Sequence, residues 1–144
     1  MKILDVNVLI HLADKSSEHH ARVHEFVERA HLAPEVIGLP WHSILGFLRI
    51  ITRRIACRSL VEPDAAHRFM SALLERPNVQ IVEPGSRHWA ILQEIGSSVG
   101  LHGNRYPDAH LAALAIENAA EMVSTDTDFA RFPRLKWTDP TRAP

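Results

Sequence analysis

Short apolar runs alternate with longer amphipathic stretches along the whole chain, and this alternation constrains the fold more than any other feature. The runs have the length of strands and are rich in Val, Ile and Leu. Strands that are buried on both faces give such continuous apolar runs, because helices cover both faces of a parallel sheet. The pattern therefore predicts an α/β fold, a three-layer α/β/α sandwich with a mostly parallel central sheet.

The expected elements follow one another in a regular order. The strands are expected at residues 2–6, 35–39, 79–84, 121–124 and 134–139. The helices are expected at residues 6–14, 18–31, 40–54, 63–76, 86–100 and 107–119, with a helical turn at 127–132. Pro40, Pro63 and Pro107 each stand where a helix is expected to begin, a position that needs no backbone N–H. No linker, repeat or low-complexity segment divides the sequence, so we expect one domain over residues 1–144.

Composition excludes several other classes of protein. The net charge of −1 gives no overall basic field that would favour nucleic acid, although a local basic patch would suffice. The single cysteine, Cys57, excludes an internal disulfide and a cysteine-rich zinc module. Asp5 interrupts the apolar N-terminal run, no small-residue cleavage site follows, and no run of about 18 apolar residues occurs. We therefore expect a cytoplasmic protein without a membrane span.

Three aspartates are expected to meet at one edge of the sheet. Asp5 lies near the end of the first strand, and Asp126 follows the strand at 121–124. Asp108 is the second residue of the helix that Pro107 opens. The carboxyl ends of parallel strands line a single edge, and the connecting helices begin at that edge. Asp5, Asp108 and Asp126 should therefore share one rim, with Asp128 close by.

Gathering carboxylates in this way is unfavourable unless a cation lies between them. Two of them about 4 Å apart repel by roughly 4 kcal/mol at an effective dielectric of 20. A ligand set made only of oxygen atoms favours a hard dication such as Mg²⁺ or Mn²⁺. Each acid also has a simpler interpretation: Asp126 as a helix cap, Asp128 as an exposed acid and Asp108 as a first-turn acid. The coincidence of three at one edge favours a metal site.

Several stretches resemble a known family. The segments "DVNVLI" (5–10), "PDAHLAALAIENAAEMVSTDTDFARFP" (107–133) and "LKWTDP" (135–140) resemble the PIN-domain ribonucleases, and more narrowly the VapC toxins of bacterial toxin–antitoxin pairs. This resemblance implies a PIN-like domain and a Mg²⁺- or Mn²⁺-dependent endoribonuclease that cleaves RNA, such as tRNA, with metal-activated water. It also implies a cognate VapB-type antitoxin as inhibitor and a homodimer.

The resemblance carries roles over to individual residues. Asp5, Asp108 and Asp126 match the metal-ligand positions. Asp128 matches an additional acid that acts through water or on a second metal. Asn7 and Thr125 match polar positions that orient metal-bound water or the acids.

One departure from the family leaves an alternative open. The family usually places a glutamate in its third helix, and Gly46 stands at that position in "WHSILGFLRI". His42 lies four residues earlier on the same helix face, closer to the rim. The alternative is a catalytically weakened PIN module that acts by binding RNA or an antitoxin. An aspartyl-phosphate phosphatase is disfavoured, because Asn7 cannot serve as the general acid.

Other groups of residues give weaker signals. His20 and His24 have metal-ligand spacing, but without a third ligand in sequence they disfavour zinc. His110 follows Asp108 closely enough to reach the rim. The segment 41–61 contains no acid and is apolar on nearly all sides. Its arginines either contact phosphate or form a solvated face; they are Arg49, Arg53, Arg54 and Arg58. Such a helix is expected to lie partly in the core and partly at a protein–protein surface.

Overall fold

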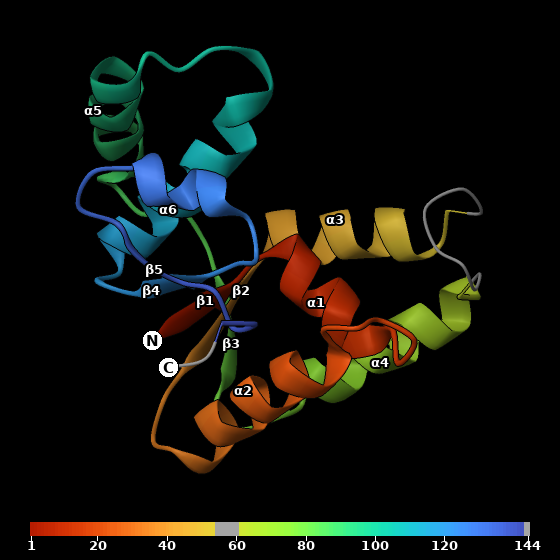
Figure 1. Ribbon diagram of the computed structural model, residues 1–144. Helices are drawn as coiled ribbons and strands as arrows, with labels where there is room; N and C mark the ends of the chain where they lie inside the picture. Colours follow the sequence, from red (N-terminus) through yellow and green to blue (C-terminus); the bar gives the residue numbers. More distant parts are fainter. Residues whose placement is uncertain (54–60, 143–144) are drawn as a thin grey trace.

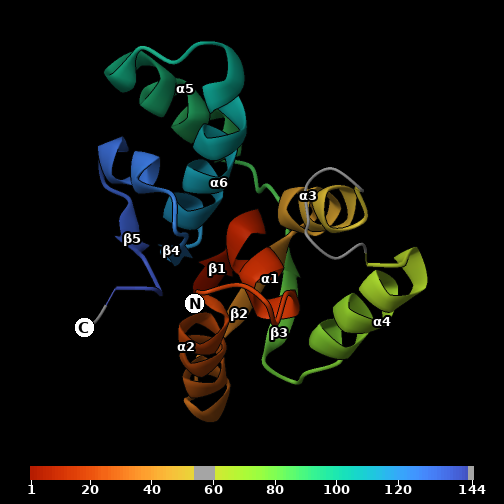
Figure 2. The ribbon, with the colours of Figure 1, turned by 45° about the vertical axis from the view of Figure 1, so that its right-hand side comes forward.

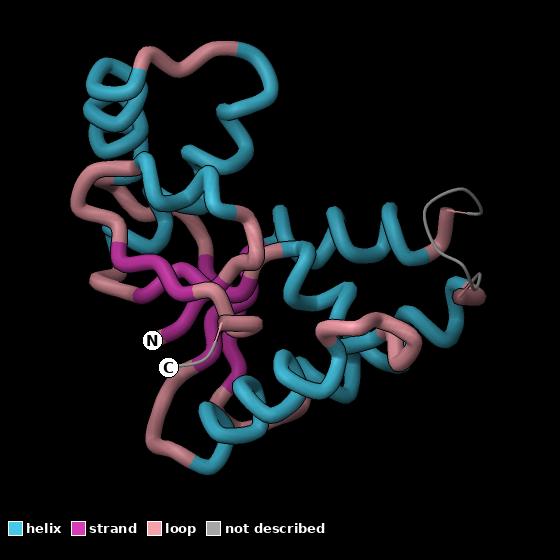
Figure 3. The backbone as a smooth tube through the Cα atoms, in the orientation of Figure 1, coloured by secondary structure: helices cyan, strands magenta, loops and turns pink. Residues whose placement is uncertain are grey.

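The computed structural model describes residues 1–53 and 61–142, so Arg54, Cys57 and Arg58 lie outside the described residues. Five parallel strands form one sheet in the order β3-β2-β1-β4-β5. They are β1 (Lys2–Leu4), β2 (Ile37–Pro40), β3 (Val79–Val82), β4 (Glu121–Val123) and β5 (Lys136–Thr138). Figure 3 shows the strands between two groups of helices. The predicted three-layer α/β fold with a parallel sheet is confirmed.

Six α-helices and two short 3₁₀ helices accompany the sheet in the described residues. They are α1 (Val6–Ala13), α2 (His20–Leu32), α3 (Trp41–Ile51), α4 (Pro63–Leu74), α5 (His88–Val99), η1 (Gly103–Arg105), α6 (Tyr106–Glu117) and η2 (Thr127–Arg131). The expected boundaries agree with these to within three residues, and several starts, such as those of α1 and α4, coincide. Pro40 was expected to begin a helix but ends β2, because its φ of −68° and ψ of 147° are those of extended backbone. The residues between the helices expected at 86–100 and 107–119, for which no element was expected, contain η1.

The helices divide between the two faces of the sheet (Figures 1 and 2). One hydrophobic core joins α1, α2, α3 and α4 to the sheet through residues such as Leu4, Val8 and Phe47. The second core joins α5, α6 and η2 to the opposite face through Ile3, Leu111 and Phe129. Ile3 and Leu4 are neighbours in β1 that enter different cores, as the alternation of side chains along a strand requires.

The order of the strands creates a crevice at the middle of the sheet. From β1 the chain continues to β2 and β3 on one side, and later crosses to β4 and β5 on the other. A ligand site is expected where the connections leave neighbouring strands in opposite directions, beyond their carboxyl ends. That position lies between the ends of β1 and β4.

Two helices show how the surroundings of this crevice are fixed. The helix α6 is buried along most of its length between the sheet and α5, and its buried residues include Ala109 and Leu111–Ala115. The helix α3 buries Ile44 and Phe47 but leaves Trp41 48% exposed and Leu45 59% exposed, so its expected partial place in the core is confirmed. No helix in the described residues is both long enough and apolar enough to cross a membrane.

Candidate active site

Asp5 stands at the centre of the candidate site. It follows β1, is 8% exposed and caps the N-terminus of α1 by accepting a hydrogen bond from the Val6 backbone N–H at 2.6 Å. The Asn7 side-chain amide donates to its second carboxylate oxygen at 2.9 Å. Burial raises the pKa of Asp5, and the nearby charge of Asp126 raises it too, while the hydrogen bonds from Ser124 and Val6 act against them.

Ser124 links the ends of β1 and β4, and the sequence did not single it out. Its fully buried hydroxyl donates to Asp5 Oδ2 at 2.6 Å. Ser124 Oγ in turn accepts hydrogen bonds from the Asn7 side-chain amide and from the Asp126 backbone N–H, both at 3.0 Å. Asn7 also accepts from the Thr125 backbone N–H at 3.2 Å. Asn7 therefore lies beside Asp5, whereas Thr125 joins this network through its backbone.

Removing the Ser124 hydroxyl should disturb both acids that it contacts. We expect Ser124→Ala to lower the free energy of unfolding by about 1–3 kcal/mol, because the buried Asp5 carboxylate and the half-buried Asn7 amide each lose a hydrogen-bond partner. RNA cleavage should fall by more than this stability loss explains, since Asp5 is no longer held. Chemical denaturation and cleavage rates at a temperature where both proteins are folded check this. Ser98→Ala, which removes an exposed hydroxyl of α5, is the control.

Asp126 and Asp128 have roles in the local structure as well. Asp126 caps η2, accepting a hydrogen bond from the Asp128 backbone N–H at 2.8 Å, so the capping interpretation is confirmed. Asp128 lies 3.0 Å from Arg131 Nη2, and this ion pair balances its charge. A capping carboxylate keeps one oxygen free, and capping therefore leaves Asp126 available to a cation.

Asp108 shows most directly that the acids are neighbours. It lies half-buried in the first turn of α6, and its pKa is raised to about 6. Burial is the largest cause, and the charges of Asp5, Asp126 and Asp128 follow. Acids that are 103 and 18 residues from Asp108 in the sequence thus repel it through space. This repulsion agrees with the predicted common rim of the three acids.

The donor set fits a hard dication that keeps much of its water. Within residues 1–53 and 61–142, no three His, Cys, Asp or Glu side chains converge tightly enough to enclose an ion by themselves. Mg²⁺ is usually held by one or two carboxylates, and water fills its other positions. An open rim of oxygen ligands is compatible with that mode of binding.

A cleft of about 490 Å³ opens beside Asp5 and Asp108. Its wall includes His42, Gly46 and Arg49 of α3. A charge on His42 lowers the pKa of Asp5, so the imidazole is within electrostatic range of the carboxylate. The cleft combines carboxylates on one side with a cation on the other, which suits a phosphodiester held against a metal site.

Gly46 has a structural reason to lack a side chain. A Cβ at this position would lie 2.6 Å from Cγ2 and 3.3 Å from Cγ1 of Val6 in α1. The first side-chain atom would therefore meet the neighbouring helix at the close contact of α1 and α3. A glutamate at position 46 needs a rearrangement of Val6 before its carboxylate can approach the rim.

This contact predicts a pair of compensating substitutions. Gly46→Ala should destabilise the protein by about 1–3 kcal/mol, the usual range for overpacking a core. Adding Val6→Ala should recover part of that loss, because it removes the two methyl groups that the new Cβ meets. Thermal unfolding of the two single variants and the double variant measures the coupling. Additive losses would contradict a direct contact.

The histidines singled out in the sequence contact one another or the backbone, and within the described residues they form no ligand set with the acids. His20 and His24 have ring centroids 5.7 Å apart, and the Nδ1 atom of His20 contacts the His11 carbonyl oxygen at 3.0 Å. His110 Nδ1 lies 3.0 Å from Nε2 of the buried His88. Burial, followed by the charges of His88 and His42, lowers the pKa of His110 to about 4. His110 is thus engaged with other histidines next to the rim.

Comparison with known proteins defines the class and then the family. The fold and its acids define the class, an α/β protein with a candidate metal site at the edge of a parallel sheet. The family model of the PIN domain matches residues 2–135. VapC ribonuclease Mb2897 of Mycobacterium bovis is 39% identical over 140 residues, which cover 97% of this chain and 95% of the relative. Ribonuclease VapC37 of Mycobacterium tuberculosis is 36% identical over 140 residues and 97% of each chain. The chain belongs to the PIN-domain family, and within it to the VapC ribonucleases.

Solved structures share the fold at lower identity. A VapBC2 complex from Rickettsia felis bound to a DNA fragment from its promoter aligns with a TM-score of 0.74 at 16% identity, covering 95% of this chain and 96% of that one. The Mycobacterium tuberculosis toxin VapC20, described as cleaving the sarcin–ricin loop, aligns with a TM-score of 0.66 at 16% identity, covering 94% and 99%. These structures support the fold as it is described above.

Proposed function

We propose that this chain is a single-domain, metal-dependent endoribonuclease toxin of the VapC type. The observation that supports the proposal is geometric: Asp5 and Asp108 line one cleft, and Ser124 Oγ joins the Asp5 carboxylate to the Asp126 backbone N–H. The pKa of Asp108, raised by burial and by the charges of the other acids, agrees with this arrangement. Membership of the VapC ribonucleases supplies the reaction class, since those relatives are named as ribonucleases. Structured RNA such as tRNA is the proposed substrate.

Asp5, Asp108 and Asp126 would hold Mg²⁺ or Mn²⁺ in this proposal. When bound, the ion supplies an activated water and neutralises charge on the leaving 3′ oxygen. Ser124, Asn7 and the Val6 N–H hold Asp5 at the rim through hydrogen bonds.

Other groups on the cleft would position the RNA. Arg49 lines the cleft from α3 and is placed to contact a phosphate. Asp128 would assist through water, although its ion pair with Arg131 must loosen for it to act on an ion.

The proposed function is tested by incubating a mixed RNA pool with the protein in Mg²⁺, in Mn²⁺ and in EDTA. Cleavage that requires the ion and leaves 5′-phosphate and 3′-hydroxyl ends supports it, because attack by water needs no 2′-hydroxyl. RNA binding without cleavage under any ion would favour the weakened module instead. Ends that carry a cyclic phosphate would contradict water as the nucleophile.

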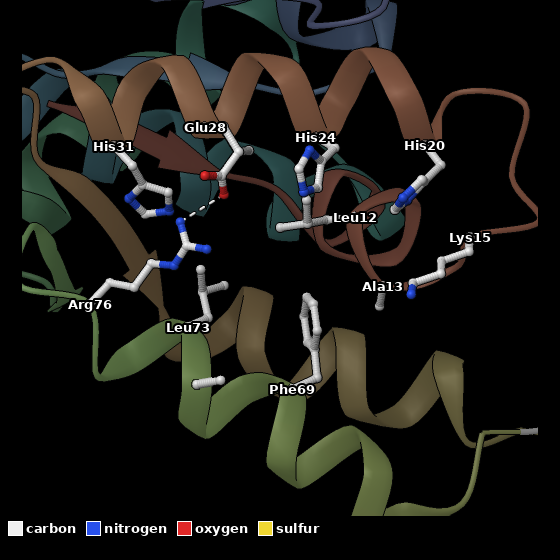
Figure 4. Close-up of a pocket in the computed structure, with 12 residues that line it drawn as sticks. Leu12, Ala13, Lys15, His20, His24, Glu28, His31, Phe69, Leu73 and Arg76 are labelled. Atoms are coloured by element: carbon white, nitrogen blue, oxygen red, sulfur yellow. Dashed lines mark hydrogen bonds and ion pairs between the residues drawn. The ribbon is translucent and has the colours of Figure 1, made fainter.

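The second part of the proposal concerns partners. Related structures are of VapBC complexes, so we propose that a VapB-type antitoxin inhibits this chain. A groove of about 350 Å³ between α2 and α4 suits such a partner (Figure 4). Its apolar wall includes Val27, Phe69 and Leu73, and its basic or ionisable rim consists of Lys15, His20, His24, His31 and Arg76. The acid on this rim, Glu28, is paired with Arg76 at 2.8 Å, so an amphipathic segment with acidic side chains complements the groove.

Reversing charge on this rim should weaken the antitoxin complex. We expect Lys15→Glu combined with His24→Glu to raise the dissociation constant of the cognate VapB-type antitoxin by roughly tenfold or more, since acids would then face acids. Calorimetric titration of the full-length proteins measures this. Lys136→Glu, which reverses an exposed charge on β5, should leave the affinity unchanged. Equal weakening by the control would show that only net charge matters.

We further propose that the toxin is cytoplasmic and forms a homodimer. The exposed side chains of Trp41 and Leu45 on α3 are the apolar surface that supports a second copy.

A further inference from the structure

A second hollow, distinct from the carboxylate cleft, lies where α5 packs against the start of α6. It encloses about 340 Å³ and is lined by Trp89, Leu92, Gln93, Gly96, Ser97 and Tyr106. The side chain of Trp89 is 68% exposed and that of Tyr106 is 49% exposed. Two large rings from different helices therefore face solvent around one depression, which leaves an aromatic surface for a ligand.

The chemistry of this wall fits a nucleobase. Trp89, Gln93 and Ser97 stand four residues apart on α5, so they share one face of the helix. The described lining contains aromatic, apolar and uncharged polar side chains. Aromatic rings stack on the flat face of a base, and an amide and a hydroxyl can bond to its edge. A phosphate would instead require cations at the wall.

The position of the hollow connects it to the candidate active site. Tyr106 lines the hollow, whereas the next two residues, Pro107 and Asp108, line the carboxylate cleft. The first turn of α6 thus separates the two depressions. Arg105 directly precedes this turn.

We propose that this hollow binds an unpaired base of the RNA substrate by stacking it on Trp89 and Tyr106 while a neighbouring phosphate lies at the acids. The inference rests on the proposed ribonuclease function and adds a source of substrate selection to it. A base can enter the hollow only where it is not stacked in a duplex, so loops and bulges of structured RNA are selected. A second copy of the chain is the competing occupant, and its binding is an outcome of the test below.

The test measures RNA binding separately from cleavage. The full-length protein carrying Asp5→Asn binds a labelled, unstructured RNA oligonucleotide, and fluorescence anisotropy gives its dissociation constant. Adding Trp89→Ala should weaken binding by roughly tenfold, the effect of losing one stacked base. Trp89→Phe should keep most of the affinity, because it retains a ring. Leu32→Ala on α2, where the side chain is 87% exposed, should leave binding unchanged.

A modified RNA identifies the group that enters the hollow. The Asp5→Asn protein that retains Trp89 should bind an oligonucleotide with abasic positions weakly. Its affinity should be about that of the Trp89→Ala variant for the complete oligonucleotide. Combining the abasic oligonucleotide with the Trp89→Ala variant should weaken binding little further. Equal binding by Trp89 and Trp89→Ala proteins, with cleavage intact in the parent, would overturn the hollow as a base site. A lower sedimentation coefficient for Trp89→Ala without loss of RNA affinity would assign the hollow to a second copy and also overturn the proposal. Absence of both binding and cleavage would overturn the ribonuclease function itself, and the base site with it.

Discussion

Asp5→Asn and Asp126→Asn are each expected to lower the rate of RNA cleavage by roughly a hundredfold or more. Each substitution removes a negative charge from the proposed metal site while keeping the size of the side chain. Losing about 3 kcal/mol of transition-state stabilisation corresponds to this factor, and a bound dication contributes several kcal/mol. Initial rates on a defined RNA at saturating Mn²⁺ measure the effect.

The chain offers a matched control for such an acid-to-amide change. Asp64 follows Pro63 in the first turn of α4, just as Asp108 follows Pro107 in the first turn of α6, but Asp64 is exposed and outside the rim. Asp108→Asn should abolish most cleavage, whereas Asp64→Asn should retain the parent rate. Comparable cleavage by the parent, Asp5→Asn and Asp126→Asn proteins would show that the acids are not the catalytic groups.

The layers of the fold could be predicted because burial leaves a clear pattern in the sequence. Strands that are covered on both faces must be apolar, and β1, β2 and β4 in the middle of the sheet are largely buried. The edge strands β3 and β5 are partly exposed, and their runs are correspondingly more polar. The boundaries were harder to predict, as Pro40 illustrates. Proline suits both the end of an extended segment and the start of a helix, so the sequence could not decide between them.

The convergence of the acids was predictable for a topological reason, and their supporting residue was not. Asp5, Asp108 and Asp126 each have a recognisable position at the end of a strand or the start of a helix. Ser124 has no such signal, since a serine after a strand is ordinary. Its importance depends on Asp5, which is 119 residues away in the sequence and 2.6 Å away in space.

The same limitation applies to Gly46. The sequence shows that position 46 lacks the glutamate of the family pattern. Only the packing shows that Val6 occupies the space that a side chain at this position would need. The sequence alone therefore shows only that the glutamate is missing. The structure adds that a glutamate at position 46 needs Val6 to move as well.

Asp108→Asn is expected to stabilise the metal-free protein at pH 7 while removing much of the stabilisation by metal. The pKa of Asp108 is about 6 in the folded protein and 3.8 as the ordinary value. Between these two pH values the folded state binds more protons than the unfolded state. The free energy of unfolding therefore falls as the pH rises from about 4 to 6, and above that the full cost of ionising Asp108 in the folded protein is present. Because Asp108 is only half-buried, solvent screening leaves about 1 kcal/mol of gain for the amide.

Thermal unfolding in EDTA and in Mn²⁺ checks both parts. In EDTA at pH 7 the amide variant should melt a few degrees higher than the parent. This difference should shrink as the pH falls from about 6 to 4, because the folded state takes up a proton at Asp108 over this range while the unfolded state stays largely ionised. Mn²⁺ at about a hundred times its dissociation constant should stabilise the parent by about 2.7 kcal/mol and the variant by clearly less. Asp64→Asn should follow the parent in every condition, and a lower melting temperature for Asp108→Asn in EDTA at pH 7 would mean that the acids do not repel one another.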